Sequence, residues 1–580
     1  MTNAEVARTF SEIADLLEIQ GADSFRVSSY RRVSRTVEDL SEEITQIAAR
    51  GELSTLPGIG KSSAGKIQEL LETGRIALRD QLAAEVPPTL LELLRIPHMG
   101  PKKVALLWKE RGVTTLSELV AAIEQNRLAG LKGFGDKTVA QIREGIEFMQ
   151  RSVGRARIGT AWAVMETVRA AVAALPGVKR IEPAGSLRRG RETIGDIDLL
   201  CVAAAPAETI GAFARLPGVT KVLAAGDTKG SVLVDAGGEA IQVDLRVVPE
   251  DSFGAAWQYF TGSKEHNVRL RELAGKRGWT LNEYALTEID TGRVLASRQE
   301  QDIYAALGLP WIPPELREDR GELEGTSVPK DLLELADIRG ELHLHTTASD
   351  GRETIEQMAA AARARGYKYI CITDHSQSSV IANGLKPERL RAHVRAVRAA
   401  AARLKGITLW VGAEVDIHSD GRLDYDDDLL AELDFVVASV HFGMGRDAEA
   451  NTRRTLAAIR NPYVNLIAHP TGRLINKRDA MPIDIDAIAR AAAETGTALE
   501  INASDFRLDL RDQHARRARE LGAVISINCD AHAGDQFDNM RFGVMTARRA
   551  GLRRGDVLNT RSAREIEAFV ARKRNRKTAE

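Results

Sequence analysis

Cysteines, long apolar runs and net charge are all scarce in this chain of 580 residues, and each scarcity excludes a class of protein. The three cysteines, Cys201, Cys371 and Cys529, lie far apart, each within an apolar run. This pattern excludes a disulfide framework and predicts buried thiols in a reducing compartment. No apolar run could span a bilayer, and the N-terminus lacks the basic start and apolar middle of a signal peptide. We therefore expect a cytoplasmic protein.

The formal net charge is −1, because 80 basic residues nearly balance 81 acidic ones. The chain as a whole therefore does not attract nucleic acid, and any contact with DNA must come from local basic groups. Histidine is unevenly distributed: of 11 histidines, only His98 and His266 precede His343. A cluster of histidines among acidic residues predicts metal chemistry in the C-terminal part.

Three regions with different patterns follow one another along the chain. Residues 1–150 read as short helices, which we divide at 85/86, and residues 151–315 mix strand-like runs with helices, as in an α+β domain. Residues 338–575, after a linker at 316–337, alternate strand and helix, which predicts a closed parallel α/β barrel. The strands expected in the α+β domain are 178–183, 197–203, 232–234 and 241–248. Those expected in the barrel are 341–346, 369–374, 408–415, 435–441, 464–469, 498–503 and 523–529.

Three similar glycine turns punctuate the first region, at residues 56–61, 96–102 and 131–137. Each follows an apolar helix and opens another, so backbone N–H groups at the start of the second helix face outward and suit a phosphate oxygen. A single glycine turn is a common structural connector, but three with a following lysine favour DNA binding. They resemble the helix-hairpin-helix motif, which grips the DNA backbone without reading sequence. The residues expected to contact DNA are Gly58, Gly60, Lys61, Gly100, Lys102, Gly133, Gly135 and Lys137.

Three aspartates in the second region predict a metal-dependent site for nucleotidyl transfer. Asp196 and Asp198, two apart on a strand, point to one face, and Asp244 lies in another strand. Carboxylates on neighbouring strands suit two Mg²⁺ or Mn²⁺ ions. A lone Asp-x-Asp is more often an exposed strand edge, but here a Gly-Ser turn and arginines precede it. Gly185, Ser186, Arg189 and Gly195 are the expected contacts to a triphosphate.

This combination resembles the nucleotidyltransferase superfamily, and the segment from Tyr259 to Asn267 is similar to a motif of the X-family DNA polymerases. The resemblance implies that Tyr259 and Phe260, followed by Gly262, line the nucleotide sugar. Asn267 and Arg271 would lie near the nascent base pair. Gln242, beside Asp244, departs from the arginine that some relatives carry there, which concerns the rate of the chemical step rather than its type.

The resemblance extends to residues 1–80, the small N-terminal domain of that family. Lys66 corresponds to the Schiff-base lysine of members with 5′-deoxyribose phosphate lyase activity. A second basic position of that motif is occupied by Ser62, so Lys66 is expected to contact DNA phosphate, with lyase chemistry left open. AP endonuclease activity is also left open.

A second set of residues of the types that bind metals lies at or near the ends of most predicted barrel strands. Because the carboxyl ends of barrel strands form the active-site face, these side chains should converge at one mouth. Polar residues at strand ends often only satisfy loop backbone, but nine of them arranged in this way favour metal binding. Imidazoles mixed with carboxylates suit Zn²⁺, Mn²⁺ or Fe²⁺. The nine are His343, His345, Asp350, His375, Glu414, His441, His469, Asp530 and His532.

The pattern resembles the polymerase and histidinol phosphatase (PHP) domain, which implies a (β/α)7 barrel holding three metals. By this resemblance one ion takes His343, His345 and Asp530, another takes Asp350, His375 and His532, and a third takes His441 and His469. Glu414 bridges two of them. Asp374 is expected to shape its loop. The histidines expected at the surface are His393, His418 and His514.

Together the resemblances imply a bacterial-type X-family polymerase whose PHP domain is a metal-dependent 3′-5′ exonuclease, acting in gap-filling base excision repair. Its expected partners are dNTPs and gapped or nicked duplex DNA with a 5′-phosphate. The protein is expected to be a monomer and not to bind membranes. Two other functions stay open. The barrel could act on a small phosphate monoester, or the chain could bind DNA ends with metals in a structural role.

Overall fold

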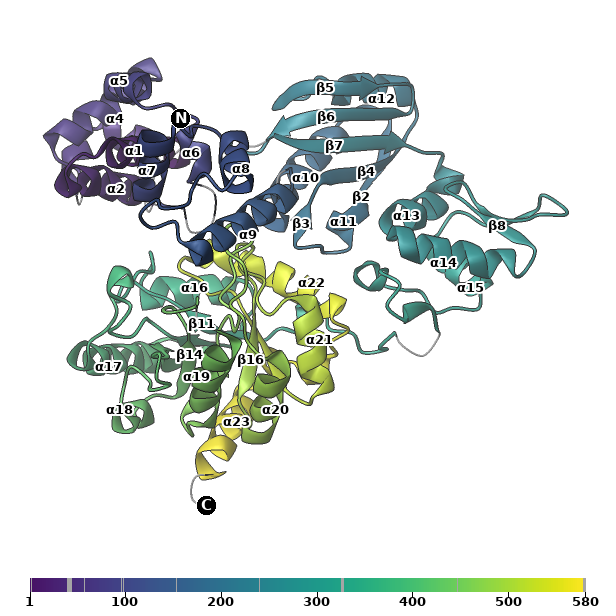
Figure 1. Cartoon of the computed structure of the whole chain (residues 1–580). Helices are drawn as coiled ribbons and strands as arrows, with labels where there is room; N and C mark the ends of the chain where they lie inside the picture. The colour runs from purple at the N-terminus through teal and green to yellow at the C-terminus, as the bar shows by residue number, and fades with distance from the viewer. Residues whose placement is uncertain are drawn as a thin grey trace. The chain divides into compact units, whose positions relative to one another are not determined.

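The computed structural model describes residues 1–576 except 2, 39–43, 57, 95, 97–98, 153, 239, 325–327 and 446. Residues 57, 97 and 98 of the predicted glycine turns thus lie outside the described part. The chain divides into two compact units (Figure 1): Met1–Val153 with Asn476–Arg478, and Gly154–Ile475 with Asp479–Glu580. Within the described ranges, no helix is both long and apolar enough to cross a membrane. All three cysteines are buried and free, as predicted.

The N-terminal unit is helical and has its own apolar core. Its helices are α1 (Asn3–Gln20), α2 (Ser24–Glu38), α3 (Ile44–Ala49), α4 (Lys61–Thr73), α5 (Ala77–Glu85), α6 (Leu90–Leu93), α7 (Pro101–Arg111), α8 (Leu116–Glu124) and α9 (Asp136–Ser152). Helices α4, α7 and α9 begin directly after the three glycine turns, which confirms that each turn opens a helix. In the first and third turns, Gly58 and Gly133 have φ of 77° and 84°, a conformation that L-residues rarely adopt.

The predicted α+β domain, called the palm from here on, is built on a sheet with strand order β2-β4-β7-β6-β5. Its elements are β1 (Ala156–Arg157), α10 (Ile158–Ala173), β2 (Val178–Pro183), α11 (Gly185–Arg188), β3 (Thr193–Ile194), β4 (Asp196–Ala203), α12 (Pro206–Phe213), β5 (Val219–Ala225), β6 (Lys229–Asp235) and β7 (Ala240–Val247). Strand β4 runs parallel to β7, and the other neighbours are antiparallel. Strands β2, β4, β6 and β7 confirm the prediction, whereas β5 and the two-residue strands β1 and β3 were not predicted.

A smaller subdomain follows the palm and has a separate apolar core. It contains α13 (Phe253–Thr261), α14 (Lys264–Gly275), β8 (Trp279–Leu281), β9 (Leu286–Glu288), β10 (Val294–Ala296) and α15 (Glu300–Ala306). A buried ion network joins it to the palm, because Glu300 contacts both Arg188 and Arg317. Arg317 and Glu322, which fall in the predicted linker, are both buried, and Glu322 lies 2.7 Å from Nδ1 of His266.

The C-terminal region is a parallel barrel whose seven strands lie in sequence order, as predicted. The strands are β11 (Gly340–Leu344), β12 (Tyr369–Ile372), β13 (Thr408–Asp416), β14 (Phe435–Ser439), β15 (Val464–Ile467), β16 (Ala498–Asn502) and β17 (Val524–Asn528). A bridge between Leu344 and Ala531 joins the first strand to the segment after the last, so the barrel is nearly closed. The surrounding helices are α16 (Ile355–Ala364), α17 (Pro387–Arg403), α18 (Asp427–Ala431), α19 (Ala448–Arg460), α20 (Ile485–Thr495), α21 (Asp512–Glu520), α22 (Met540–Arg549) and α23 (Ala563–Arg576). Each of the seven strands lies where a strand was predicted, because a strand buried on both faces is a continuous apolar run in the sequence.

Candidate active sites

The three predicted aspartates meet on one face of the palm sheet. Asp196 and Asp198 begin β4, and Asp244 lies in the adjacent β7. The parallel register pairs Asp198 with Asp244, and Asp196 with Gln242. Because residues two apart on a strand share a side, the three carboxylates face the same way.

The electrostatics of this face fit a cation site. Burial, followed by the charges of Asp196 and Asp244, raises the pKa of Asp198 to about 7. Burial would also raise the pKa of Asp244, but hydrogen bonds from Lys229, Gln242 and Ser231 outweigh it and lower that pKa. The Lys229 ammonium lies 2.8 Å from Asp244. Three carboxylates whose charges Lys229 and Arg189 offset only in part are the chemistry that binds Mg²⁺ or Mn²⁺.

Gly185 explains why a glycine precedes the aspartate pair. It has φ of +60°, and a Cβ on it would lie 2.1 Å from Oδ2 of Asp198. Ser186 follows it in the short helix α11. Gly195 leaves room in the same way for Arg155, whose Nη1 would lie 3.1 Å from a Cβ there.

Arg189, predicted as a triphosphate ligand, already has partners. Its Nη1 donates to the carbonyl oxygen of Thr261 at 2.7 Å, and its Nε lies 3.1 Å from Glu318. Its positive charge also reaches Asp198 and offsets a small part of the rise in the pKa of that carboxyl. A role in triphosphate binding stays a prediction and requires the guanidinium to leave Glu318.

The residues predicted to line the nucleotide form one connected group. The rings of Tyr259 and Phe260 are 5.1 Å apart and nearly perpendicular. Nδ2 of Asn267 donates to the carbonyl oxygens of Tyr259 (2.7 Å) and Gly262 (3.3 Å). Nε of Arg271 donates in turn to the carbonyl oxygen of Asn267 at 3.3 Å. Asn267 therefore fixes the end of α13 that carries both aromatic residues.

The basic residues of the hairpin turns lie at the surface. Lys61, Lys102 and Lys137 are exposed at the starts of α4, α7 and α9. Lys66, one turn into α4, is half-buried and donates from Nζ to Oγ of Ser62 at 3.0 Å.

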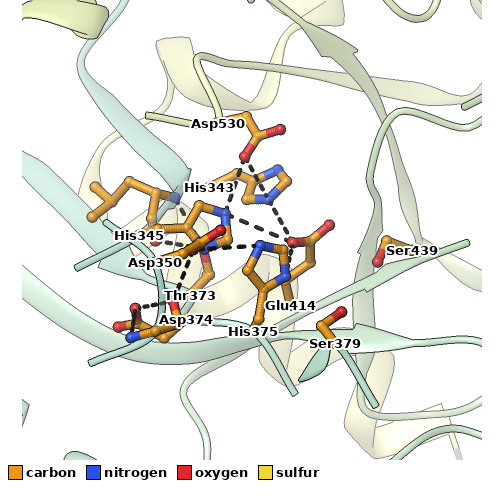
Figure 2. Close-up of polar contacts among 12 residues, drawn as sticks. His343, His345, Asp350, Thr373, Asp374, His375, Ser379, Glu414, Ser439 and Asp530 are labelled. Atoms are coloured by element: carbon orange, nitrogen blue, oxygen red, sulfur yellow. Dashed lines mark hydrogen bonds and ion pairs between the residues drawn. The ribbon is translucent and has the colours of Figure 1, made fainter. Parts of the chain in front are cut away.

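The nine predicted ligands of the barrel converge at its mouth. Figure 2 shows side chains from β11, β13 and the loops after β12 and β17 pointing toward one another. Three groups among them hold ligand atoms that all lie within 4.8 Å of one another. The groups are His345, Asp350, His375 and His532; His343, His345 and Asp530; and His375, Glu414 and His441.

Two of the groups contain the trios predicted for two of the ions, with His345 shared between them. His375 joins His441 and Glu414 in the third group, where His469 was expected. His469 nevertheless lies close, with Nε2 3.0 Å from Oε1 of Glu414. Glu414 thus contacts imidazoles on both of its oxygens, as a bridging carboxylate requires.

Orphaned polar atoms show that this mouth fits metal ions. Nε2 of His343, Nδ1 of His345 and of His469, and Oε2 of Glu414 are buried without a hydrogen-bond partner. Nδ1 of His375 lies 2.8 Å from that Glu414 oxygen, yet no hydrogen bond joins them. Buried polar atoms are costly unless satisfied, and divalent cations shared among these ligands would supply partners for the atoms that face the centre.

The pKa values follow from the same crowding. Burial disfavours the charge on Glu414, but the imidazoles of His375, His441 and His343 outweigh it and hold the pKa well below its usual range. Burial and the charges of His375 and His532 lower the pKa of His345 to about 4. His345 is therefore neutral at pH 7, the form in which an imidazole binds a metal.

Two carboxylates that the sequence analysis did not single out orient ligand histidines. Oε1 of Glu500 lies 2.8 Å from Nδ1 of His343, and Oδ1 of Asp416 lies 2.8 Å from Nδ1 of His441. Each leaves Nε2 directed at the centre, an arrangement typical of metal-binding histidines. An acidic residue inside or at the end of an apolar strand was the signal that could have identified them.

Asp374 shapes its loop, as predicted. It accepts hydrogen bonds from the backbone N–H of Thr346 at 2.8 Å and from Oγ of Ser349 at 2.6 Å. Its other partner corrects a prediction: His393 is buried rather than at the surface, with Nε2 2.9 Å from Asp374. His393 lies in α17, where the many polar residues give no indication of which of them faces inward.

Comparison with known proteins gives matches along most of the chain. The matching family models are a helix-hairpin-helix domain (residues 1–76), a SAM-like helix-hairpin-helix tandem (90–147), a DNA polymerase beta thumb (256–318) and a PHP domain (341–504). DNA polymerase/3′-5′ exonuclease PolX of Bacillus subtilis is 39% identical over 572 residues, which cover 99% of this chain and 100% of the relative. The chain belongs to the PolX family. Its α13–α15 subdomain is accordingly the PolX thumb, and its barrel is a PHP domain.

Two more distant relatives each match part of this PolX chain. DNA polymerase lambda of Rattus norvegicus is 26% identical over 343 residues, or 54% of this chain and 56% of the relative. A "Probable phosphatase" of Thermoanaerobacter sp. (strain X514) is 31% identical over 243 residues, or 40% of this chain and 94% of the relative.

Proposed function

We propose that this protein is a DNA polymerase that fills gaps in DNA repair and carries a 3′–5′ exonuclease in its PHP domain. The observation that carries the proposal is one chain with two separate ligand sets: the aspartate face of the palm and the nine-residue mouth of the barrel. The PolX relative from Bacillus subtilis, named for both activities, supports it over the whole length.

In the palm, Asp196, Asp198 and Asp244 would hold Mg²⁺ or Mn²⁺. Such ions, when bound, activate an attacking 3′-hydroxyl and stabilise the leaving pyrophosphate. Asp198 must lose its proton to bind a cation, and its raised pKa makes this step sensitive to pH near neutrality. Tyr259 and Phe260 would lie against the sugar of the incoming nucleotide.

In the barrel, the nine ligands would hold three ions, with Zn²⁺, Mn²⁺ or Fe²⁺ as candidates. Bound ions of this kind supply a nucleophile and stabilise charge in phosphodiester hydrolysis. The protein's own part is to orient the imidazoles and fix their tautomers, which Glu500 and Asp416 do for His343 and His441.

The test uses purified protein with Mn²⁺ on a labelled primer–template, with and without dNTPs. Asp196→Ala should abolish primer extension and leave 3′-end degradation intact, whereas His343→Ala should do the opposite. Each variant is thus the control for the other. Extension by Asp196→Ala, or degradation by His343→Ala, would remove the corresponding assignment.

A role in gap repair predicts a substrate preference. A gapped duplex with a 5′-phosphate should be extended faster than an open template, with Lys66 near the phosphate and the protein acting as a cytoplasmic monomer. Equal extension of both would argue against that role. Sodium borohydride trapping on a 5′-deoxyribose phosphate end would reveal lyase chemistry at Lys66, and Lys66→Ala should prevent it.

A phosphatase function for the barrel is the second candidate, favoured by the match of 40% of this chain to the Thermoanaerobacter "Probable phosphatase". Turnover of p-nitrophenyl phosphate faster than that of a DNA 3′ end would support it. DNA binding without turnover in any metal would instead support a purely structural role for the ions.

A further inference from the structure

A small basic cavity lies at the seam between the palm and the barrel, and its lining includes none of the predicted metal ligands. Its volume is about 140 Å³. An apolar cavity of roughly 150 Å³ holds a benzene molecule, so this space suits an anion of similar size, such as phosphate. The charged residues that line the cavity are Arg191, Glu192, Arg320, Arg511, Asp512 and Arg549.

The four arginines of this cavity outnumber its two carboxylates, and one carboxylate is neutralised by another residue. Oε2 of Glu192 lies 2.7 Å from Nη2 of Arg473, which is not among the lining residues. Asp512 is shared by Arg320 and Arg549, whose guanidinium nitrogens lie 2.9 Å and 3.1 Å from its Oδ2. The cavity therefore keeps an excess of positive charge, and an anion is the ligand that would balance it.

Two of the four arginines have no close carboxylate partner. Within the part of the chain that the structure describes, no carboxylate pairs with Arg511, whose Nε donates to Nε2 of His514 at 3.3 Å. Nη1 of Arg191 lies 3.8 Å from Oε2 of Glu318, a carboxylate that already binds two other arginines. Arg511 and Arg191 thus have donors left for an anion, one from the barrel and one from the palm.

The neighbouring titratable groups show the same positive field. Burial, followed by the charges of Arg511 and Arg473, lowers the pKa of His514 to about 4. Burial, followed by nearby arginines that include Arg320, lowers the pKa of Arg516, whose Nε is buried without a hydrogen-bond partner. His514 is neutral at pH 7, so the field comes from the arginines.

Direct contacts between the palm and the barrel fix the seam that holds the cavity. Arg549 is only 4% exposed, and its Nη1 donates to the carbonyl oxygen of Arg189 at 2.8 Å. Nη1 of Arg157 in the palm lies 3.1 Å from Oδ2 of Asp505, in the segment that follows β16. The walls of the cavity are therefore in place before a ligand arrives, which lowers the entropy cost of binding one.

We propose that this cavity binds a phosphate group. Arginine presents a planar fork of donors that matches phosphate oxygens, and it stays charged across the physiological pH range. The group can belong to free phosphate or to the backbone of a DNA strand, because both present the same oxygens. The site goes beyond the proposed function, since it needs neither metal centre and neither activity. The arginines that would hold the group come from the palm, the predicted linker and the barrel: Arg191, Arg320, Arg511 and Arg549.

Isothermal titration calorimetry of the full-length protein with sodium phosphate tests the proposal. Phosphate can also bind at metal-loaded sites and at the hairpin turns, so the difference between variants is the quantity to measure. Arg511→Gln should weaken one class of phosphate sites by about tenfold, the loss of a charge-assisted hydrogen bond, and Arg511→Lys should recover part of it. Arg517→Gln is the matched control and should bind as wild type, because Arg517 is an exposed arginine of α21 that pairs with Asp486.

A second variant tests the palm side of the cavity and guards against misfolding. Arg191→Gln should weaken the same class of sites by a similar factor. If Arg511→Gln lowers the unfolding midpoint in the absence of phosphate, Arg191→Gln decides the question, because Arg191 has no close ion pair to lose. Binding of phosphate by both variants as tightly as by wild type would overturn the proposal.

A single-stranded oligonucleotide without terminal phosphates separates the two sources of the phosphate group. If Arg511→Gln weakens binding of both ligands and phosphate competes with the oligonucleotide, the site takes the DNA backbone. If only the affinity for phosphate falls, the site takes the free anion. Both results support the site, and neither depends on turnover, so a failure of the proposed polymerase or exonuclease function would leave them unchanged.

Discussion

Gly185 is the residue on which the geometry of the palm carboxylates most directly depends, because a methyl group there would displace Asp198. We expect Gly185→Ala to reduce primer extension at least about 100-fold by moving a metal ligand, and to leave 3′-end degradation unchanged. Gly237→Ala is the matched control, since Gly237 also has a positive φ but nothing lies within 4 Å of its Cβ position. Similar losses of extension in both variants would attribute the effect to backbone strain.

Glu300 gives a pH-dependent stability that can be predicted in sign. Burial would raise its pKa, but Arg317 and Arg188 outweigh burial and lower the pKa to about 2. Because the folded pKa lies below the unfolded value of 4.5, the carboxylate stabilises the native state above that pH. The contribution is lost as pH falls through about 2.

Urea unfolding of wild type and Glu300→Gln from pH 3 to 7 measures this contribution. The variant leaves two buried guanidinium groups without a carboxylate, so it should lose about 3–5 kcal/mol of unfolding free energy at pH 7 and less at pH 3. Glu250→Gln, which breaks the exposed pair with Lys179, should change little at any pH. A difference independent of pH would contradict the assignment.

At the scale of elements, the three hairpin helices should act together on DNA. Replacing Lys61, Lys102 and Lys137 by alanine should weaken binding to a gapped duplex, irrespective of its sequence. The slope of log K against log salt concentration should become shallower by roughly 0.9 for each phosphate that a lysine no longer neutralises. Fluorescence anisotropy across a KCl series measures this, with Lys405→Ala, an exposed lysine of the barrel, as the control. An unchanged slope would mean that the turns are connectors only.

The elements also show how far the sequence could predict the fold. The barrel strands were predictable because each is a buried apolar run, and all but β16 carry a ligand or are followed closely by one. Strand β5 was missed because six of its seven residues are exposed, which leaves no alternating pattern. Strands β8–β10 have three residues each, too few for any periodicity.

The candidate sites were predictable only where chemistry lies in local motifs. The aspartates and the nine barrel ligands carry recognisable spacings. Glu500 is 157 residues from the His343 that it orients, and Glu300 is 112 residues from Arg188. Such partners are chosen by the fold in three dimensions, and nothing in their immediate sequence distinguishes them from ordinary polar residues.

For the whole molecule, metal binding should be a major source of stability. The ligand atoms at the barrel mouth are buried and lack partners, so ions bind the folded state far better than the unfolded one. At a free-metal concentration of about 1,000 times Kd, loading stabilises by about 4 kcal/mol. Calorimetry should therefore show a lower midpoint after chelation, and the midpoint of His343→Ala should respond less. Equal responses would place the stabilising ions elsewhere.

The segment that follows β16 belongs to the barrel, but the palm supplies part of its packing. Arg157 stacks 3.4 Å over Phe506, and a Cβ on Gly159 of the palm would meet Asp505 at 2.5 Å. An isolated barrel would keep its metal ligands, which its own strands supply, but would lose the surface on which this segment rests. The two halves are therefore not interchangeable modules. A substitution at Gly159 in the palm would therefore also disturb the segment around Asp505 in the barrel.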